Sequence, residues 1–212
     1  MGYQQNSVPN GYAMITPCFE TVGGGNYPID NLIIEGASDD DSVTVQVVNP
    51  DGTWGINGVW LNAFEDYPAG WFTDSSGEES ADIRLKPGQA VFFYSSSSSV
   101  KVQSAGQVAG VITNSVSAGY SMIGNATPVV LPIDSITIEG ASDDDSVTVQ
   151  IVNHDGTWGT NGVWLNAFEE YPAGWFTDSS GEESADITLQ PGQSVFFYTS
   201  ATSAKVIIPS AL

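Results

Sequence analysis

The chain has 212 residues, of which 41% are hydrophobic and 11% aromatic, and 4 Lys and Arg stand against 25 Asp and Glu, giving a formal net charge of −21. The apolar content suffices for a buried core, whereas so acidic a surface repels phosphate backbones, which excludes nucleic acid as an expected partner. One cysteine rules out an intramolecular disulfide framework, and one histidine leaves little for zinc or general-base chemistry.

Short β-rich runs alternate with turn signals, and no stretch sustains an apolar spacing of 3.6 residues, so the sequence predicts an all-β fold. Along one run Val43, Val45 and Val47 fall on one face and Thr44, Gln46 and Val48 on the other, which indicates a strand with one core side and one partly wet side. The strands expected in the first half are 12–18, 31–35, 42–48, 59–64, 81–85, 90–94 and 100–103, with counterparts in the second half.

The second half of the chain repeats the first. Residues 28–103 align with 132–207 at a constant offset of 104, with about four positions in five identical. Upstream the match continues after a four-residue slip, so that Gly11-Tyr12 answers Gly119-Tyr120. We therefore expect two tandem, nearly identical small β-sandwich or barrel lobes, residues 1–108 and 109–212, held in contact by a short linker.

Two acidic runs are candidate metal ligands, because Ca²⁺ takes six to eight oxygen ligands and favours carboxylates on loops. The alternative is a solvated hairpin tip whose charges keep a sheet edge from pairing with other sheets. No other cofactor is expected. The runs are Asp39, Asp40, Asp41 and Asp143, Asp144, Asp145.

Paired carboxylates recur at Glu65-Asp66 with Glu78-Glu79 and at the matching positions of the second half, as a glycosidase would require. Two intact copies in lobes too small for an enclosed substrate groove argue against catalysis, so we expect no enzyme. The sequon Asn125-Ala126-Thr127 is interpreted as a chance match.

Trp and Tyr side chains recur in both halves and could stack on sugar rings or anchor a protein interface. Trp60 and Trp164 lie inside expected strands and are predicted to be core residues. Trp71, Phe72, Trp175 and Phe176 follow a Tyr-Pro-Ala-Gly segment in an expected loop, and we predict that they are exposed interface or ligand residues.

The order Gly-Tyr-x-Met-Ile, Asp-Gly-Thr-Trp, Gly-Trp-Phe and Leu-x-Pro-Gly-Gln resembles a tandem β-sandwich module of bacterial surface proteins and phage-encoded structural proteins. The first copy spans Gly11–Ile15, Asp51–Trp54, Gly70–Phe72 and Leu85–Gln89, and the second repeats the order, with Ser121 in place of Ala13. The resemblance implies no catalytic residues.

The N-terminal segment shows neither a basic region followed by an apolar stretch nor the ~18 apolar residues of a membrane span, so neither export nor membrane insertion is expected. A virion setting therefore fits better than a cell surface. We expect a non-enzymatic phage structural protein, such as a capsid decoration protein, that is homo-oligomeric or lattice-bound beside other virion proteins. The alternative is an extracellular module for glycan binding or adhesion, with avidity arising from the duplication.

Overall fold

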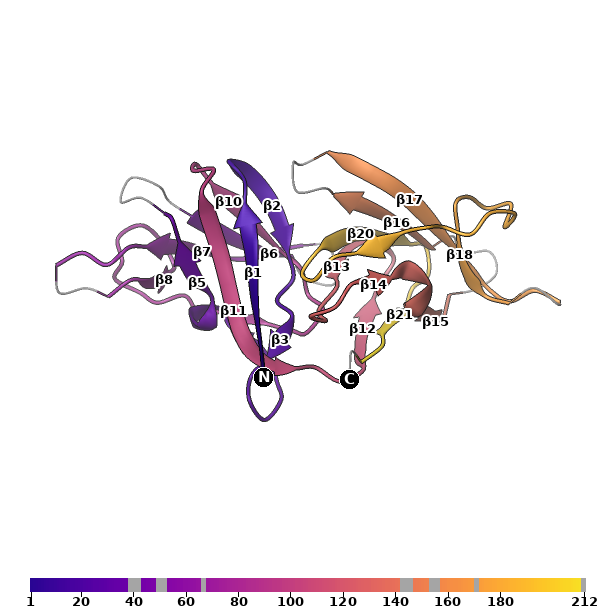
Figure 1. Ribbon diagram of the computed structural model, residues 1–212, viewed down its shortest axis with the longest axis horizontal. Coiled ribbons are helices and arrows are strands. Elements are labelled where there is room, and N and C mark those ends of the chain that lie inside the picture. Colours follow the sequence, from indigo (N-terminus) through magenta and orange to yellow (C-terminus); the bar gives the residue numbers. More distant parts are fainter. Residues whose placement is uncertain are drawn as a thin grey trace.

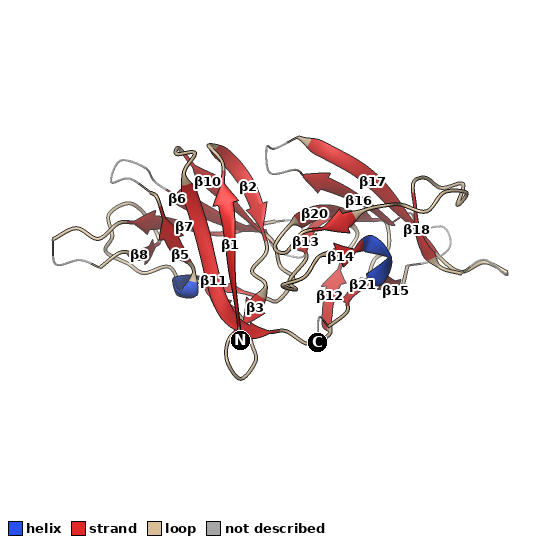
Figure 2. Ribbon diagram, in the orientation of Figure 1, coloured by secondary structure: helices blue, strands red, loops and turns tan. Residues whose placement is uncertain are grey.

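The computed structural model describes residues 1–37, 43–48, 53–65, 68–141, 147–152, 157–169 and 172–210. The protein is all-β, as predicted, and the named strands pair antiparallel throughout (Figure 2). Strands of the first half occupy one end of the long axis and strands of the second half the other (Figure 1). The helical segments among the described residues are two three-residue 3-10 turns, η1 (Ile29–Asn31) and η2 (Ile133–Ser135).

The first half contains a five-stranded sheet in the order β2-β10-β6-β7-β8. A second sheet forms on the long strand β11, which pairs with β1, β5 and β3, and a short ribbon joins β4 to β9. The strands are β1 (Gly2–Val8), β2 (Gly11–Ile15), β3 (Phe19–Glu20), β4 (Tyr27–Pro28), β5 (Ile33–Glu35), β6 (Val43–Val48), β7 (Trp54–Leu61), β8 (Gly70–Phe72), β9 (Arg84–Leu85), β10 (Val91–Ser95) and β11 (Val100–Val108).

The second half repeats this arrangement. Its five-stranded sheet runs β13-β20-β16-β17-β18, its second sheet β12-β21-β15, and its ribbon β14-β19. The strands are β12 (Ile112–Val116), β13 (Gly119–Gly124), β14 (Leu131–Pro132), β15 (Thr137–Glu139), β16 (Val147–Val152), β17 (Trp158–Leu165), β18 (Gly174–Phe176), β19 (Thr188–Leu189), β20 (Ser194–Thr199) and β21 (Ala204–Ile208).

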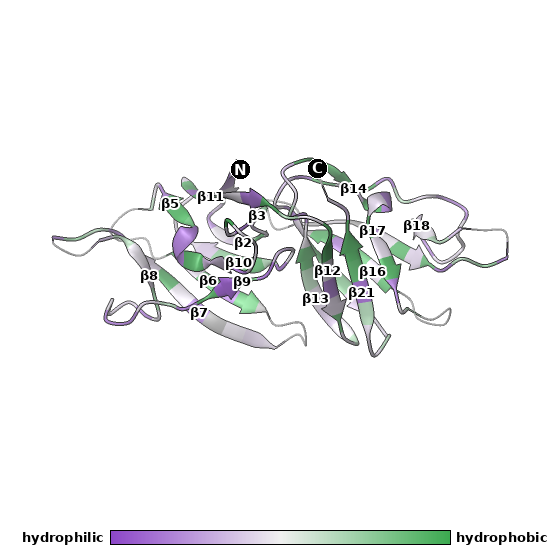
Figure 3. Ribbon diagram, turned by 90° about the horizontal axis from the view of Figure 1, so that it is seen from below, coloured by the Kyte–Doolittle hydropathy of each residue, from purple (hydrophilic) through white to green (hydrophobic). Residues whose placement is uncertain are grey.

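Each half buries its own apolar cluster, one drawn from residues 8–102 and the other from residues 109–208. Val43, Val45 and Val47 are buried and Thr44 and Gln46 half-buried, which confirms the predicted alternation along β6. Along β21, seen from below in Figure 3, Ala204, Val206 and Ile208 are buried and Lys205 between them is exposed. The cores therefore follow from period-2 patterning, which places every second side chain on one face of a strand.

Several strands depart from the predicted ranges. β7 begins at Trp54, upstream of the expected start at residue 59, and carries Gly55 and Gly58. Gly58 is required inside this strand, because a Cβ there would lie 2.9 Å from Val45 Cγ1 and 3.0 Å from Ile83 Cδ1. β1 was not predicted because its residues are mostly polar, and β8 occupies a stretch that was expected to be a loop.

The four-residue slip between the halves has a structural cause. The first half inserts β3 and a turn in which Thr21 Oγ1 donates to the Gly24 carbonyl oxygen at 2.9 Å. β3 pairs with the end of β11, where Val108 opposes Phe19. The second half passes directly from β13 to β14 through residues 125–130.

The two halves meet around an approximate two-fold relation. Ile15 bridges to Gln193, and the equivalent residues of the other half, Ile123 and Gln89, form the matching bridge. The Thr16 N–H donates to the Gly192 carbonyl at 2.9 Å, and the Gly124 N–H donates to the Gly88 carbonyl at 3.2 Å. Each Leu-x-Pro-Gly-Gln turn is therefore hydrogen-bonded to the opposite half.

Candidate functional site

The outward side of the first five-stranded sheet carries a row of side chains that cross all five strands. The register places Tyr12 opposite Tyr94, Tyr94 opposite Thr44, Thr44 opposite Val59, and Val59 opposite Phe72. These positions alternate with the buried ones along each strand, so their side chains point away from the core.

Aromatic rings on this side contact one another. The ring centroid of Tyr12 lies 5.0 Å from that of Tyr94 and 6.4 Å from that of Phe92, and Trp54 lies 5.5 Å from Phe92. Tyr12 is 61% exposed and Trp54 60% exposed. Rings that contact each other and still face solvent retain surface for a partner.

The Tyr pair recurs on the second half, where Tyr120 is 64% exposed and its ring centroid lies 5.0 Å from that of Tyr198. Phe92 and Phe196 join the two clusters, and the small apolar group of Met14, Ala90 and Met122 packs beside them. We call this surface the aromatic face: Tyr12, Met14, Trp54, Phe92, Tyr94, Tyr120, Met122, Phe196 and Tyr198.

Charge separates the aromatic face from the rest of the molecule. Among the described outward positions of β2, β6, β7, β8 and β10, no residue is acidic or basic, although the chain carries a net charge of −21. The polar neighbours of the rings are uncharged, namely Thr44, Gln46 and Asn57. Loss of charge together with enrichment in Tyr, Trp, Phe and Met is the composition of the buried centre of a protein interface.

The prediction that Trp71 and Trp175 are exposed is wrong. Both are 1% exposed and lie in strands, where their indole Nε1–H groups donate to the carbonyl oxygens of Leu32 at 3.2 Å and Ile136 at 2.8 Å. The large apolar ring fills the core and its N–H finds a buried acceptor. A ligand cannot stack on either indole.

Phe72 and Phe176, the residues next to these indoles, point the other way and are half-buried on the outward side of their sheets. They extend the row of Tyr12 and Tyr94, so their role as contact residues stays a prediction. Trp60 and Trp164 are buried, which confirms that part of the prediction.

The two candidate calcium runs, Asp39–Asp41 and Asp143–Asp145, lie outside the described residues, so calcium binding there stays a prediction. Within the described part of the chain, no group of three or more His, Cys, Asp or Glu residues is placed to hold a metal ion.

The described acidic side chains of the paired carboxylates, which we do not expect to be catalytic, are exposed. Glu65 and Glu169 occupy turns with φ of 50° and 52°, while Asp66 and Glu170 lie outside the described residues. In a neighbouring loop, hydrogen bonds from the Ser76 hydroxyl and backbone N–H lower the pKa of Asp74, and Ser180 does the same for Asp178. These bonds order the loops and leave Asp74 ionised at neutral pH.

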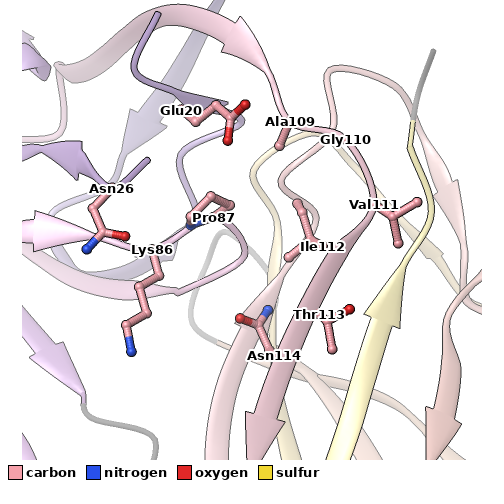
Figure 4. Close-up of a pocket in the computed structure, with 10 residues that line it drawn as sticks. All are labelled: Glu20, Asn26, Lys86, Pro87, Ala109, Gly110, Val111, Ile112, Thr113 and Asn114. Atoms are coloured by element: carbon pink, nitrogen blue, oxygen red, sulfur yellow. The ribbon is translucent and has the colours of Figure 1, made fainter. Parts of the chain in front are cut away.

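A hollow of about 280 Å³ lies at the junction of the halves (Figure 4). Unlike the aromatic face, it is lined by charged residues as well as uncharged ones. Lys86 and Glu20 place opposite charges on its rim, Gly110 comes from the segment that links the halves, and Asn114 comes from β12. The buried Nδ2 of Asn114 has no hydrogen-bond partner among the described residues and lies against the Pro-Gly turn, 2.5 Å from where a Cβ of Gly88 would be. That amide therefore belongs to the packing of the junction.

Cys18 and Asn125 also belong to the junction. Burial raises the pKa of the Cys18 thiol to about 12, against the lowering effect of a backbone hydrogen bond with Gly192. The thiol lies 3.2 Å from the Thr127 carbonyl oxygen, to which it donates. Asn125 is fully buried and its Nδ2 donates to the Val129 and Leu189 carbonyls, so this sequon residue has a structural role.

Sequence reasoning missed the ring residues of β2 and β10. The sequence predicts a strand over residues 90–94 but does not say what each of its two sides contacts. The sequence does contain a signal for these residues. Large apolar or aromatic side chains occupy odd and even positions alike in Val91, Phe92, Phe93 and Tyr94, which indicates a strand with two apolar faces.

Within the described residues, neither 3-10 turn nor any other helical segment has the length and apolarity needed to cross a membrane. Comparison of the chain with protein-family models, with curated proteins and with solved structures found no match.

Proposed function

We propose that the chain is a non-enzymatic structural protein that joins a larger protein assembly through the aromatic face, and that this assembly is a virion, in which the chain serves as a capsid decoration or other outer protein. The observation that carries the proposal is an uncharged aromatic surface continuous across both halves of a chain with a net charge of −21. The virion setting rests on the resemblance of the repeated motifs to phage-encoded structural modules.

Two physical arguments support attachment to a protein. Exposed Trp and Tyr carry most of the binding energy at many protein interfaces, and the buried Met14, Ala90 and Met122 pack beneath Phe92 and Phe196 where the two parts of the face meet. The acidic charge outside the face repels other copies of the chain and favours a neutral or basic partner.

The test compares the full-length chain with a triple variant, Tyr12→Ser, Trp54→Ser and Tyr120→Ser, each produced together with the candidate shell proteins of the virion. The matched control changes Phe64→Ser and Phe168→Ser, two rings that are 70% and 65% exposed. We expect the wild type and the control to co-purify with particles in negative-stain images and the triple variant to remain in the soluble fraction. A wild-type chain that stays a monodisperse monomer and ignores every shell component contradicts the proposal.

A second candidate function is binding of a neutral glycan, which is favoured by one specific arrangement. The uncharged side chains of Gln46 and Asn57 stand opposite each other in the register, and Phe92 of the aromatic face is the other neighbour of Gln46. Rings for stacking beside groups that donate and accept hydrogen bonds suit a sugar.

Tryptophan fluorescence during titration with neutral oligosaccharides separates the two candidates. A saturable change that disappears in Trp54→Ser supports glycan binding. Silence across a glycan array, with unchanged fluorescence, contradicts it and leaves the structural proposal untouched.

A further inference from the structure

Two equivalent positions of the repeat, Thr16 and Gly124, face each other where the halves meet. A Cβ on Gly124 would overlap Thr16 Oγ1 and lie 2.6 Å from Thr16 Cβ. The backbone of Gly124 has no left-handed φ, so the glycine is required by the space that Thr16 and the Gln193 carbonyl oxygen occupy and not by a turn.

A second pair of equivalent positions, Ala90 and Ser194, also differs between the halves. Thr16 Oγ1 and Ser194 Oγ are hydrogen-bonded at 2.9 Å across the junction, and both residues are buried. The first-half counterpart of Ser194 is the buried Ala90. The first half therefore presents Thr and Ala, and the second half presents Gly and Ser.

Other equivalent positions around this contact also carry different residues in the two halves. Cys18 of the first half donates its thiol to carbonyls of Asn125 and Thr127 in the second half, whereas its own counterpart is Ala126. The Pro-Gly turn at Gly192 packs against Gln4, while the turn at Gly88 packs against Ile112, the counterpart of Gln4.

We propose that the junction is a selective docking surface whose partner is the unlike half, and that it rejects pairing of like halves. Two first halves would bring Thr16 against Thr16 in space that holds one side chain and a glycine. Two second halves would leave a void between two glycines and remove the hydroxyl that Ser194 contacts. Both outcomes are unfavourable, through overpacking or through a cavity with an unpaired buried hydroxyl.

This selectivity matters because the halves are nearly identical. When the first half pairs with the second half of the same chain, the junction is closed. If first halves paired with first halves and second halves with second halves of other chains, the chains would form an open-ended series. Interfaces commonly carry an element that disfavours the competing assembly. The inference does not depend on what the aromatic face binds.

The test is a set of full-length variants that make the halves alike or exchange them. Gly124→Thr with Ser194→Ala gives both halves Thr and Ala. Thr16→Gly with Ala90→Ser gives both halves Gly and Ser. The exchanged variant carries all four substitutions and restores an unlike pair in the opposite orientation.

We expect each like variant to lose roughly 5–10 °C in unfolding midpoint and the exchanged variant to lose less than either. The Gln193 carbonyl oxygen, 2.9 Å from the Cβ position of residue 124, keeps this recovery incomplete. An exchanged variant that loses as much as either like variant, or more, overturns the proposal. If a like variant fails to fold, the unfolding midpoint and native mass of the exchanged variant still test the proposal. A folded monomeric exchanged variant supports selectivity, and an aggregated one contradicts it.

Discussion

Phe92 and Phe196 occupy equivalent positions of the repeat, and their ring centroids lie 6.2 Å apart with an interplanar angle of 48°. The approximate two-fold axis that relates the two halves therefore passes between these two rings. Each ring also belongs to the outward side of its own sheet, so one contact both stabilises the junction and joins the two parts of the aromatic face.

Truncation of this pair should show coupling between the halves. Phe92→Ala and Phe196→Ala should each lower the free energy of unfolding, and a double-mutant cycle should give an interaction energy of about 0.5–1.5 kcal/mol, as for other aromatic pairs in contact. Denaturant unfolding of the four proteins measures it. Phe64→Ala with Phe168→Ala is the matched control, because no contact between these exposed rings joins the halves in the described structure, and its effects should add.

Replacement of a buried indole should cost stability without any change on the aromatic face. Trp71→Phe removes the hydrogen bond to the Leu32 carbonyl oxygen and leaves a void beside Trp60, whose ring centroid is 5.5 Å away. We expect a loss of about 2–3 kcal/mol, measured by chemical denaturation. Trp54→Phe on the exposed surface serves as the control and should change stability by less than about 0.5 kcal/mol. Equal effects of the two substitutions would show that Trp71 is not a core residue.

The sequence predicts the fold class and the core well because both depend on local patterns. Alternation along β6 identifies the buried valines, and the duplication identifies where each element recurs. Trp71 was misplaced because a Pro-Ala-Gly segment reads as a loop, whereas its indole occupies the core and pairs with the Leu32 carbonyl, a contact between residues far apart in sequence.

The aromatic face and the junction could not be derived from the sequence for a different reason. Tyr12 and Phe92 become neighbours only through strand pairing, and Phe92 meets Phe196 only when two sheets are placed side by side. The difference between Thr16 and Gly124 looks like an unremarkable substitution until the two positions are seen to face each other. Side-chain patterns specify which face of a strand is buried, but they do not specify which strand ends meet.

Cys18 should be unreactive in the folded protein. Its thiol is buried, its pKa is raised to about 12, and thiol reagents require the thiolate. We expect negligible modification by a water-soluble disulfide reagent at pH 8 and full, rapid modification in denaturant. Rapid modification of the native protein would mean that the junction opens readily.

The same shift predicts how stability depends on pH. The folded-state pKa lies above the ordinary value of 9.0, so the folded protein holds the proton more tightly than the unfolded chain. This contribution is fully present below pH 9 and is lost as the pH rises toward 12. Thermal midpoints of wild type and Cys18→Ala, measured from pH 7 to 10.5, should differ in slope above pH 9, with the steeper fall in wild type. Parallel curves would contradict the assignment, because other titrating groups are common to both proteins.

Asn125 should be a stability residue of the second half. Its Nδ2 donates to the carbonyls of Val129 at 2.8 Å and Leu189 at 3.0 Å, and its Oδ1 accepts from the Thr127 N–H at 2.9 Å, so one fully buried side chain satisfies three backbone groups. Asn125→Ala removes the partner of the buried Leu189 carbonyl and Thr127 N–H, whereas the Thr127 hydroxyl still donates to the Val129 carbonyl at 3.2 Å, and we expect a loss of roughly 2–4 kcal/mol by denaturant unfolding. Thr127→Ser, which keeps the hydroxyl that Asn125 Oδ1 accepts from, is the matched control and should lose about 1 kcal/mol or less. If Asn125→Ala were as mild as the control, backbone groups of this segment would have to find other partners, and the loop from β13 to β14 would not depend on this side chain.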